Sequence, residues 1–353
     1  PTGIFKDAAE TYIESVIPPP SFEQKVEQAI AATEYAASLG ITSAQDMGSS
    51  AVDISVYQEL MRQGKLKTRL YGCTTLAELK RWQDVGINYA FGTPWLRVGC
   101  LKAYADGSLG STTAWLFEPY ADAPNTSGLP RADVMTTMMQ RIIDADKARL
   151  QVNIHAIGDR ANAAILDHFA VLDAANGTRD RRFRIEHAQH LRQQDIARFG
   201  KLKVIASMQP MHVYDDGKWA GKRIGTERLK GTYAFRTLLD TGAVLAFGSD
   251  SPVANLNALF GIYAAVTRQT SDLANPTGWM PQQKITVDEA VRAFTYGSAY
   301  AEFQDAVKGT LEVGKLADFV ILSQDIFTID PTKIRYVQVV TTIVDGKVVF
   351  ERK

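Results

Sequence analysis

Short apolar segments alternate with longer amphipathic segments along most of the chain. This alternation is typical of a parallel α/β fold, in which each strand is followed by a helical crossover. Seven strands are predicted, at residues 41–44, 68–72, 96–102, 152–155, 183–187, 204–208 and 244–247.

Helix signals lie between several of these strands. A capping box at 21–24 predicts a helix that stops at Gly40, and a second capping box at 286–289 predicts another helix start. A third helix is indicated by apolar residues that recur every four positions, which places them on one helix face. These residues are Val134, Met138 and Ile142.

The strand and helix pattern favours a (β/α)₈ barrel that lacks one strand. No Gly-rich nucleotide fingerprint follows a strand, which argues against a doubly wound sheet. After about residue 300 the pattern changes to short β segments, at 316–322 and 337–342, and to a hairpin around Asp345-Gly346. We therefore predict a barrel domain over 1–305 that contains strands 2 to 8, and part of a β-sandwich over 306–353.

The charge balance, the hydropathy and the number of cysteines exclude several classes of function. The chain has 353 residues, with 39 Lys plus Arg and 39 Asp plus Glu, so it has no basic excess of the kind that nucleic-acid or acidic-membrane binding requires. No apolar run reaches the roughly 20 residues of a membrane span. We expect neither nucleic acid nor membrane as a partner. Two cysteines are too few for a disulfide framework or for a thiolate zinc site.

Four polar residues follow or end predicted strands, where the active site of a barrel lies. They are Lys102, His155, His187 and Asp250. Two imidazoles and a carboxylate are suitable ligands for a divalent metal such as zinc. Each residue also has a simpler interpretation, because a single His at a strand end is commonly a hydrogen-bonded core residue and Gly-Ser-Asp is commonly a turn or a helix cap.

Other candidates are given structural roles. His168 lies within a helical pattern, where packing is favoured, and His190 is expected at the surface or the rim of the barrel. The segment 309–316 has the spacing of a phosphate loop, but Leu316 replaces the required hydroxyl and a strand follows. The segment 107–111 lacks the order of a nucleophile elbow.

Several stretches, taken together and in order, resemble the amidohydrolase superfamily. Within it they are similar to the amidohydrolase-3 branch, which includes the N-substituted formamide deformylases. The resemblance covers nearly the whole chain. The matching stretches are 102–111, 155–161, 185–189, 209–212 with Asp216 and Trp219, 247–253 and 309–319.

The resemblance implies a metal-dependent hydrolase of amide-type C–N bonds that uses one or two divalent ions, expected to be zinc. His155 and His187 would be metal ligands, and Lys102 would be a carboxylated lysine that bridges two ions. Asp250 would be a ligand and would shuttle the proton from a metal-bound hydroxide to the leaving amine. A buried ammonium beside a cation is disfavoured, whereas a carbamate on the same side chain is anionic. The resemblance also implies a substrate pocket shaped by His212, Asp216 and Trp219, placed on the loop after the seventh barrel strand.

The sequence departs from the family pattern at its amino-terminal end. The first barrel strand of the family carries a His-x-His pair of ligands, and no two histidines of this sequence are two positions apart. The amino-terminal contribution to the β-sandwich is also missing. We therefore expect the chain to be part of a longer gene product, and to bind metal weakly on its own. A cytoplasmic location is expected.

Two other functions remain open on the sequence alone. A catalytically silent relative could act as a regulatory or binding protein, although the joint presence of Lys102, His155, His187 and Asp250 argues against it. A structural metal site would have a closed coordination sphere. The expected partner is a small-molecule amide, with formamides, other N-acyl amines and cyclic amides all open, and the sequence leaves a homo-oligomer open.

Overall fold

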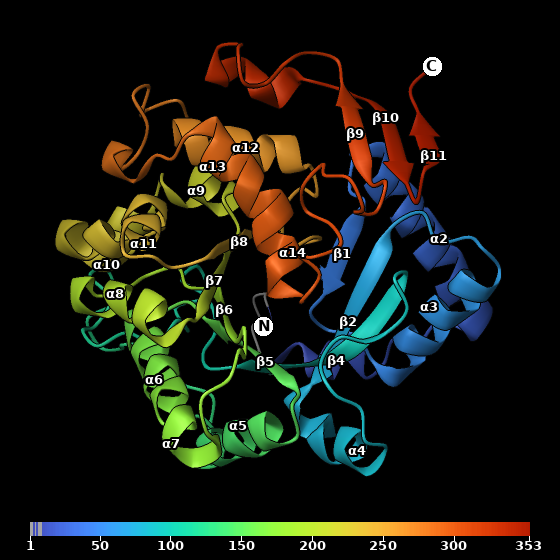
Figure 1. The fold of residues 1–353 in the computed structure, drawn as a ribbon. Helices are drawn as coiled ribbons and strands as arrows, with labels where there is room; N and C mark the ends of the chain where they lie inside the picture. The colour runs from blue at the N-terminus through green and yellow to red at the C-terminus, as the bar shows by residue number, and fades with distance from the viewer. Residues whose placement is uncertain (1–2, 4, 6–8) are drawn as a thin grey trace.

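The computed structural model describes residues 3, 5 and 9–353, and its main feature is an open parallel sheet (Figure 1). The seven parallel strands follow one another in chain order, and each agrees with a predicted strand to within a few residues. The chain thus has an α/β, TIM-like architecture that forms part of a barrel. The strands are β1 Ser43–Asp46, β2 Arg69–Thr75, β4 Leu96–Tyr104, β5 Gln151–Ala156, β6 Arg184–His187, β7 Ile205–Met208 and β8 Leu245–Phe247.

Helices cover the outer face of this sheet and pack their apolar side chains against it. Both predicted capping boxes are present, at the starts of α2 and α13. None of the described helices has both the length and the hydropathy that a membrane span requires. The α-helices are α1 Thr11–Glu14, α2 Phe22–Ser38, α3 Ala51–Arg62, α4 Leu79–Asp84, α5 Met138–Lys147, α6 Asp159–Ala170, α7 Leu172–Asn176, α8 Gln193–Leu202, α9 Met211–Asp216, α10 Ala220–Arg228, α11 Phe235–Asp240, α12 Ala258–Thr267, α13 Val287–Arg292 and α14 Ser298–Ala301.

Shorter helical turns join these elements. One of them is a π-helix, η5 Ala293–Gly297, which runs directly between α13 and α14. The predicted helix around Val134 begins later than expected, at Met138, because residues 132–137 form turns, although Val134 itself is buried. The 3₁₀-helices are η2 Leu76–Glu78, η3 Leu229–Gly231, η4 Pro281–Gln283 and η6 Pro331–Tyr336.

A small antiparallel sheet follows the barrel portion, as predicted. Its strands are β9 Phe319–Leu322, β10 Val339–Val344 and β11 Lys347–Glu351, and β10 lies in the centre. Asp345 and Gly346 form the hairpin turn, and both have the positive φ that a type I′ turn needs. One face packs on α2, where the Thr342 hydroxyl donates to the Ala37 carbonyl at 2.7 Å. A two-residue strand, β3 Phe91–Gly92, pairs with β4 and was not predicted.

The parallel sheet does not close. Within the part of the chain that the structure describes, β1 pairs only with β2 and β8 pairs only with β7. Ser298, the first residue of α14, bridges the two edges. Its hydroxyl donates to the Phe247 carbonyl of β8 at 2.9 Å, and its carbonyl accepts from the side chain of Gln45 on β1 at 2.8 Å. One helical turn thus joins the two ends of the sheet.

The two cysteines lie opposite each other on neighbouring strands. Cys73 of β2 is in register with Cys100 of β4, and the two side chains form a disulfide. Two cysteines are too few for a disulfide framework, but this single pairing was not predicted from the sequence. Both residues are fully buried on the inner side of the sheet.

A buried ion pair connects the barrel portion to the C-terminal sheet. Arg69 of β2 donates two hydrogen bonds to Asp318, at 2.6 and 2.9 Å, and both side chains are almost completely buried. The residue preceding β9 is therefore fixed to the second strand of the parallel sheet. Removing one partner of such a pair leaves the other charge buried without compensation.

We expect Asp318→Asn to destabilise the protein by about 3 kcal/mol in urea unfolding. This loss of stability is near the lower end of the range for breaking a buried ion pair, because Asp345 also accepts a hydrogen bond from Arg69 and keeps part of its charge compensated. The matched control is Asp84→Asn on α4, whose pair with Lys80 is exposed. That substitution should change stability by less than about 0.5 kcal/mol. Equal effects of the two substitutions would contradict the structural importance of the buried pair.

Candidate metal centre

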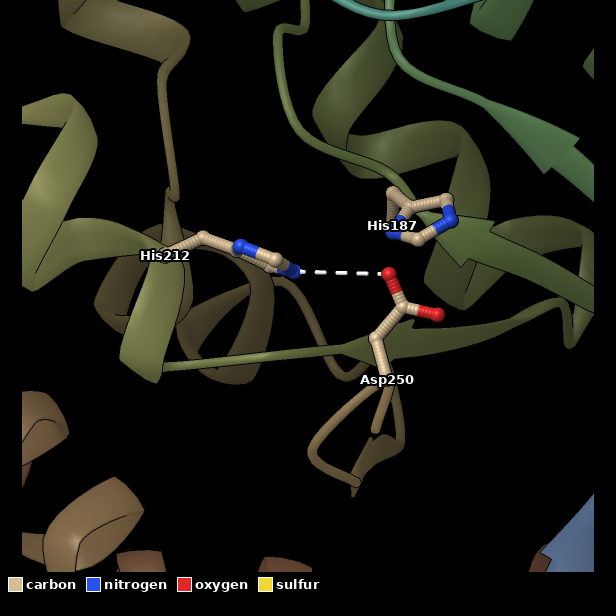
Figure 2. A group of neighbouring side chains, drawn as sticks. All are labelled: His187, His212 and Asp250. Atoms are coloured by element: carbon tan, nitrogen blue, oxygen red, sulfur yellow. Dashed lines mark ion pairs between the residues drawn. The ribbon is translucent and has the colours of Figure 1, made fainter. Parts of the chain in front are cut away.

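Three potential metal ligands meet at the carboxyl edge of the parallel sheet (Figure 2). His187 is the last residue of β6, His212 is the second residue of α9 after β7, and Asp250 follows β8. One potential ligand atom from each residue lies within 4.8 Å of the others. In Figure 2 the Asp250 carboxylate points between the two imidazoles, and its Oδ2 lies 3.6 Å from Nε2 of His212.

Two of these side chains belong to residues with an uncommon backbone conformation, which sets the direction in which each side chain leaves the chain. His187 has φ +74° and Asp250 has φ +61°, both in the left-handed region that non-glycine residues rarely adopt. Such conformations cost energy and are enriched at functional sites. At His187 the turn ends β6 and leaves the imidazole buried, whereas the Asp250 side chain is 37% exposed. The acid therefore lies on the open side of the group.

His155, the other histidine of the expected ligand set, adjoins this group. Its ring centroid lies 4.5 Å from that of His187, in an edge-on arrangement. Its Nε2 lies 3.0 Å from the carbonyl of Gly107 and 3.4 Å from Oδ1 of Asp106. A carbonyl can only accept, so Nε2 carries a hydrogen; in the neutral ring this tautomer has its lone pair on Nδ1.

Asp106 holds this part of the site together and was not singled out from the sequence. Its buried carboxylate accepts backbone N–H groups from Trp115, Ile157 and Gly158 at 2.8 to 3.0 Å. The loop after β4 and the end of β5 are therefore fixed to one side chain, next to His155. In the sequence, the only signal is an Asp two positions after the end of β4, at the strand end where barrel sites lie.

Lys102, expected as a carboxylated lysine, is buried near the end of β4. Burial lowers the pKa of its ammonium to about 8, and the nearby Glu186 opposes this change. Its Nζ lies 5.0 Å from the ring centroid of Tyr104. Among the described residues no carboxylate forms an ion pair with it. A neutral amine, the form that can react with carbon dioxide, is therefore more accessible here than for an exposed lysine.

The electrostatic surroundings favour a neutral His187. Burial lowers the pKa of His187 well below its usual value, and the neighbouring His155 and Lys102 lower it further. A neutral imidazole has the lone pair that a metal requires. Two imidazoles and a carboxylate are ordinary ligands of zinc and of other divalent transition metals, so the residues fit such an ion.

The structure assembles the expected residues differently from the prediction. It brings His187 and Asp250 together, and it adds His212, which the sequence analysis had assigned to the substrate pocket. Residues 211–216 form the short helix α9 rather than a loop. The other two residues expected at the pocket are not members of this group. Asp216 accepts hydrogen bonds from Gln189 and Tyr233 at 2.9 and 2.6 Å, and Trp219 lies beside Gly110 of the loop after β4.

The two remaining histidines have structural roles, but one prediction was wrong. His168 is partly buried and lies 2.9 Å from the Val134 carbonyl, which confirms its packing role. His190 is 2% exposed, not a surface or rim residue. It is buried because it forms a β-bridge with Thr232, whose hydroxyl lies 2.9 Å from its Nδ1. Burial lowers the pKa of His190 to about 3.

A cavity of about 530 Å³ is lined by sequence neighbours of the three-residue group, but by none of the three residues themselves. Its walls include Met211, the neighbour of His212 in the sequence, and Ser251, the neighbour of Asp250. Aromatic side chains contribute much of the remaining wall. These are Tyr35, Tyr214 and Phe260. The volume is in the range of small-molecule sites.

Comparison with known proteins gives one consistent result. A sequence model described as amidohydrolase family matches residues 1–350. The chain is 39% identical to Protein LONG AFTER FAR-RED 3 of Arabidopsis thaliana, in an alignment that covers 92% of this chain. It is 31% identical to the putative amidohydrolase YtcJ of Bacillus subtilis, in an alignment that covers 100% of this chain. It is also 28% identical to the N-substituted formamide deformylase of Arthrobacter pascens over 60% of its length and 38% of that protein.

Solved structures agree with the sequence relatives. An uncharacterized metal-dependent hydrolase from Pyrococcus furiosus superposes with a TM-score of 0.77, at 30% identity, over 91% of this chain and 64% of that one. The chain spans 57% of the Arabidopsis relative and 66% of the Bacillus relative.

Proposed function

Because the chain belongs to the amidohydrolase family, we propose that it is a metal-dependent hydrolase of amide-type C–N bonds. The observation that carries this proposal is the convergence of His187, His212 and Asp250 at the carboxyl edge of the sheet. Chemistry in parallel barrels takes place at this edge. The cavity lined by Met211 and Ser251, the sequence neighbours of His212 and Asp250, offers space for a small-molecule amide.

In this proposal His187, His212 and Asp250 hold a divalent ion, expected to be zinc. Such an ion, when bound, lowers the pKa of a coordinated water and polarises a carbonyl oxygen. Asp250 accepts the proton of the attacking water and returns it to the nitrogen of the leaving amine. Its position on the open side of the group suits this role, because the side chain is 37% exposed and so remains accessible to a bound molecule.

Two neighbouring residues complete the proposed site. His155 engages its Nε2 with Gly107, lies with its ring against that of His187 and is a further ligand candidate through Nδ1. Lys102 would be carboxylated, which converts a buried ammonium of lowered pKa into an anion with two ligand oxygens. Both residues belong to the ligand set that the sequence resemblance implies. A carbamate on Lys102 would be a ligand of a second ion, and we include that ion in the proposal.

The proposal is tested by metal removal. The purified protein is incubated with formamides, N-acyl amines and cyclic amides, and released amine is detected by mass spectrometry. We expect a chelator to abolish hydrolysis and added zinc to restore it, while circular dichroism shows that the fold is retained. Hydrolysis that survives chelation would contradict the proposal. Unfolding on chelation would indicate a structural metal, and no hydrolysis by the zinc-loaded protein would favour a silent binding protein.

A further inference from the structure

Gln209 lies between the end of β7 and α9 and contacts the most buried histidine of the metal centre. Its side-chain oxygen lies 2.7 Å from Nδ1 of His187, and both side chains are buried. Because Gln209 comes 22 positions after His187 in the sequence, this contact joins two neighbouring strand ends. The mechanism above does not use Gln209.

The orientation of the Gln209 amide is determined by a second hydrogen bond. Its Nε2 donates to the carbonyl of Ser207 at 3.3 Å. With the amide reversed, its oxygen would face the Ser207 carbonyl, which is also an acceptor, and that pairing is repulsive. The amide oxygen must therefore face His187. Since an amide oxygen can only accept, Nδ1 of His187 carries the hydrogen.

We propose that Gln209 is a positioning residue that fixes His187 in the Nδ1–H tautomer and so makes Nε2 its ligand atom. The proposal rests on the proposed function, because it concerns the same metal centre. A hydrogen-bond acceptor on the second nitrogen of a metal-binding imidazole sets the tautomer, orients the ring and increases the basicity of the ligand nitrogen. Loss of such a partner lowers metal affinity by about 10- to 100-fold.

The first test measures the tautomer in the metal-free protein. Long-range ¹H–¹⁵N spectra of ¹⁵N-histidine-labelled protein distinguish the two neutral tautomers, and only five histidines contribute signals. The His187 signals are assigned from their loss in His187→Ala. We expect the pattern of a protonated Nδ1 and an unprotonated Nε2. The opposite pattern would overturn the proposal, whether or not the protein hydrolyses amides.

Substitutions then separate positioning from simple packing. Gln209→Met has a similar shape but replaces the amide oxygen by a thioether that accepts only weakly, so we expect a mixture of His187 tautomers and a 10- to 100-fold weaker zinc affinity by chelator competition. Gln209→Glu retains an acceptor and should restore the Nδ1–H tautomer. If Gln209→Met leaves the tautomer and the affinity unchanged, Gln209 only fills space and the proposal is wrong.

A matched control exists at the neighbouring buried histidine. Thr232→Val removes the hydroxyl that lies 2.9 Å from Nδ1 of His190, which is not in the ligand group. We expect the signals of His190 to change while the tautomer of His187 and the zinc affinity do not. A loss of zinc affinity in Thr232→Val equal to that in Gln209→Met would show a general effect of buried hydrogen bonds, and would overturn the specific role of Gln209.

Discussion

Asp250→Asn should lower kcat for amide hydrolysis at least about 10³-fold. General acid–base catalysis alone contributes about 10²- to 10⁴-fold, and the substitution also removes the only carboxylate from the three-residue group. Asparagine has nearly the same size but neither the charge to hold a cation nor the basicity to accept a proton. The measurement is the rate of amine release from a substrate found in the metal-removal experiment.

The stability of this variant provides an internal check. Because the Asp250 side chain is 37% exposed, we expect its free energy of unfolding to change by no more than about 0.5 kcal/mol. Asp240→Asn on α11, another exposed acid, is the control and should keep full activity. Hydrolysis by Asp250→Asn within tenfold of the unsubstituted protein would exclude Asp250 as the proton shuttle.

His187→Ala is expected to weaken zinc binding at least about 100-fold in chelator competition, since removal of a ligand should exceed the effect of removing a ligand's hydrogen-bond partner. The readout does not depend on a substrate. His168→Ala is the matched control, because it removes an imidazole of the same type that contacts only the Val134 carbonyl among the polar groups of the described chain.

Comparing His187→Ala with His168→Ala shows whether zinc binds at the three-residue group or elsewhere. If His187→Ala binds zinc as tightly as the unsubstituted protein, the ion lies elsewhere and the three-residue group is not the metal centre. A loss in both variants would indicate a general loss of structure, which circular dichroism would reveal. His187→Ala also places alanine at φ +74°, so some loss of stability is expected independently of metal.

The strands could be predicted from the sequence because parallel strands buried on both faces are continuous apolar runs. Residues 244–247 are an example, and the structure has a strand at Leu245–Phe247. The capping boxes were equally reliable because each is a local arrangement of side chain and backbone. The strand β3 was missed because two residues are too few to produce a pattern.

The candidate site was predicted only in part because convergence depends on the paths of loops. His187 and Asp250 end or follow strands, so the sequence placed them at the same edge. His212 joins them because α9 turns its first residues toward β6, which no local pattern reveals. The burial of His190 likewise depends on Thr232, 42 positions away.

The Ser298 bridge between β8 and β1 has a consequence for the order of folding. Its contact with Gln45 joins residues 253 positions apart, whereas neighbouring parallel strands pair over much shorter separations. Closing so long a loop is entropically unfavourable until intervening elements have already shortened the path. The strands are therefore expected to pair successively along the chain, and the two ends of the sheet to meet in one of the last steps.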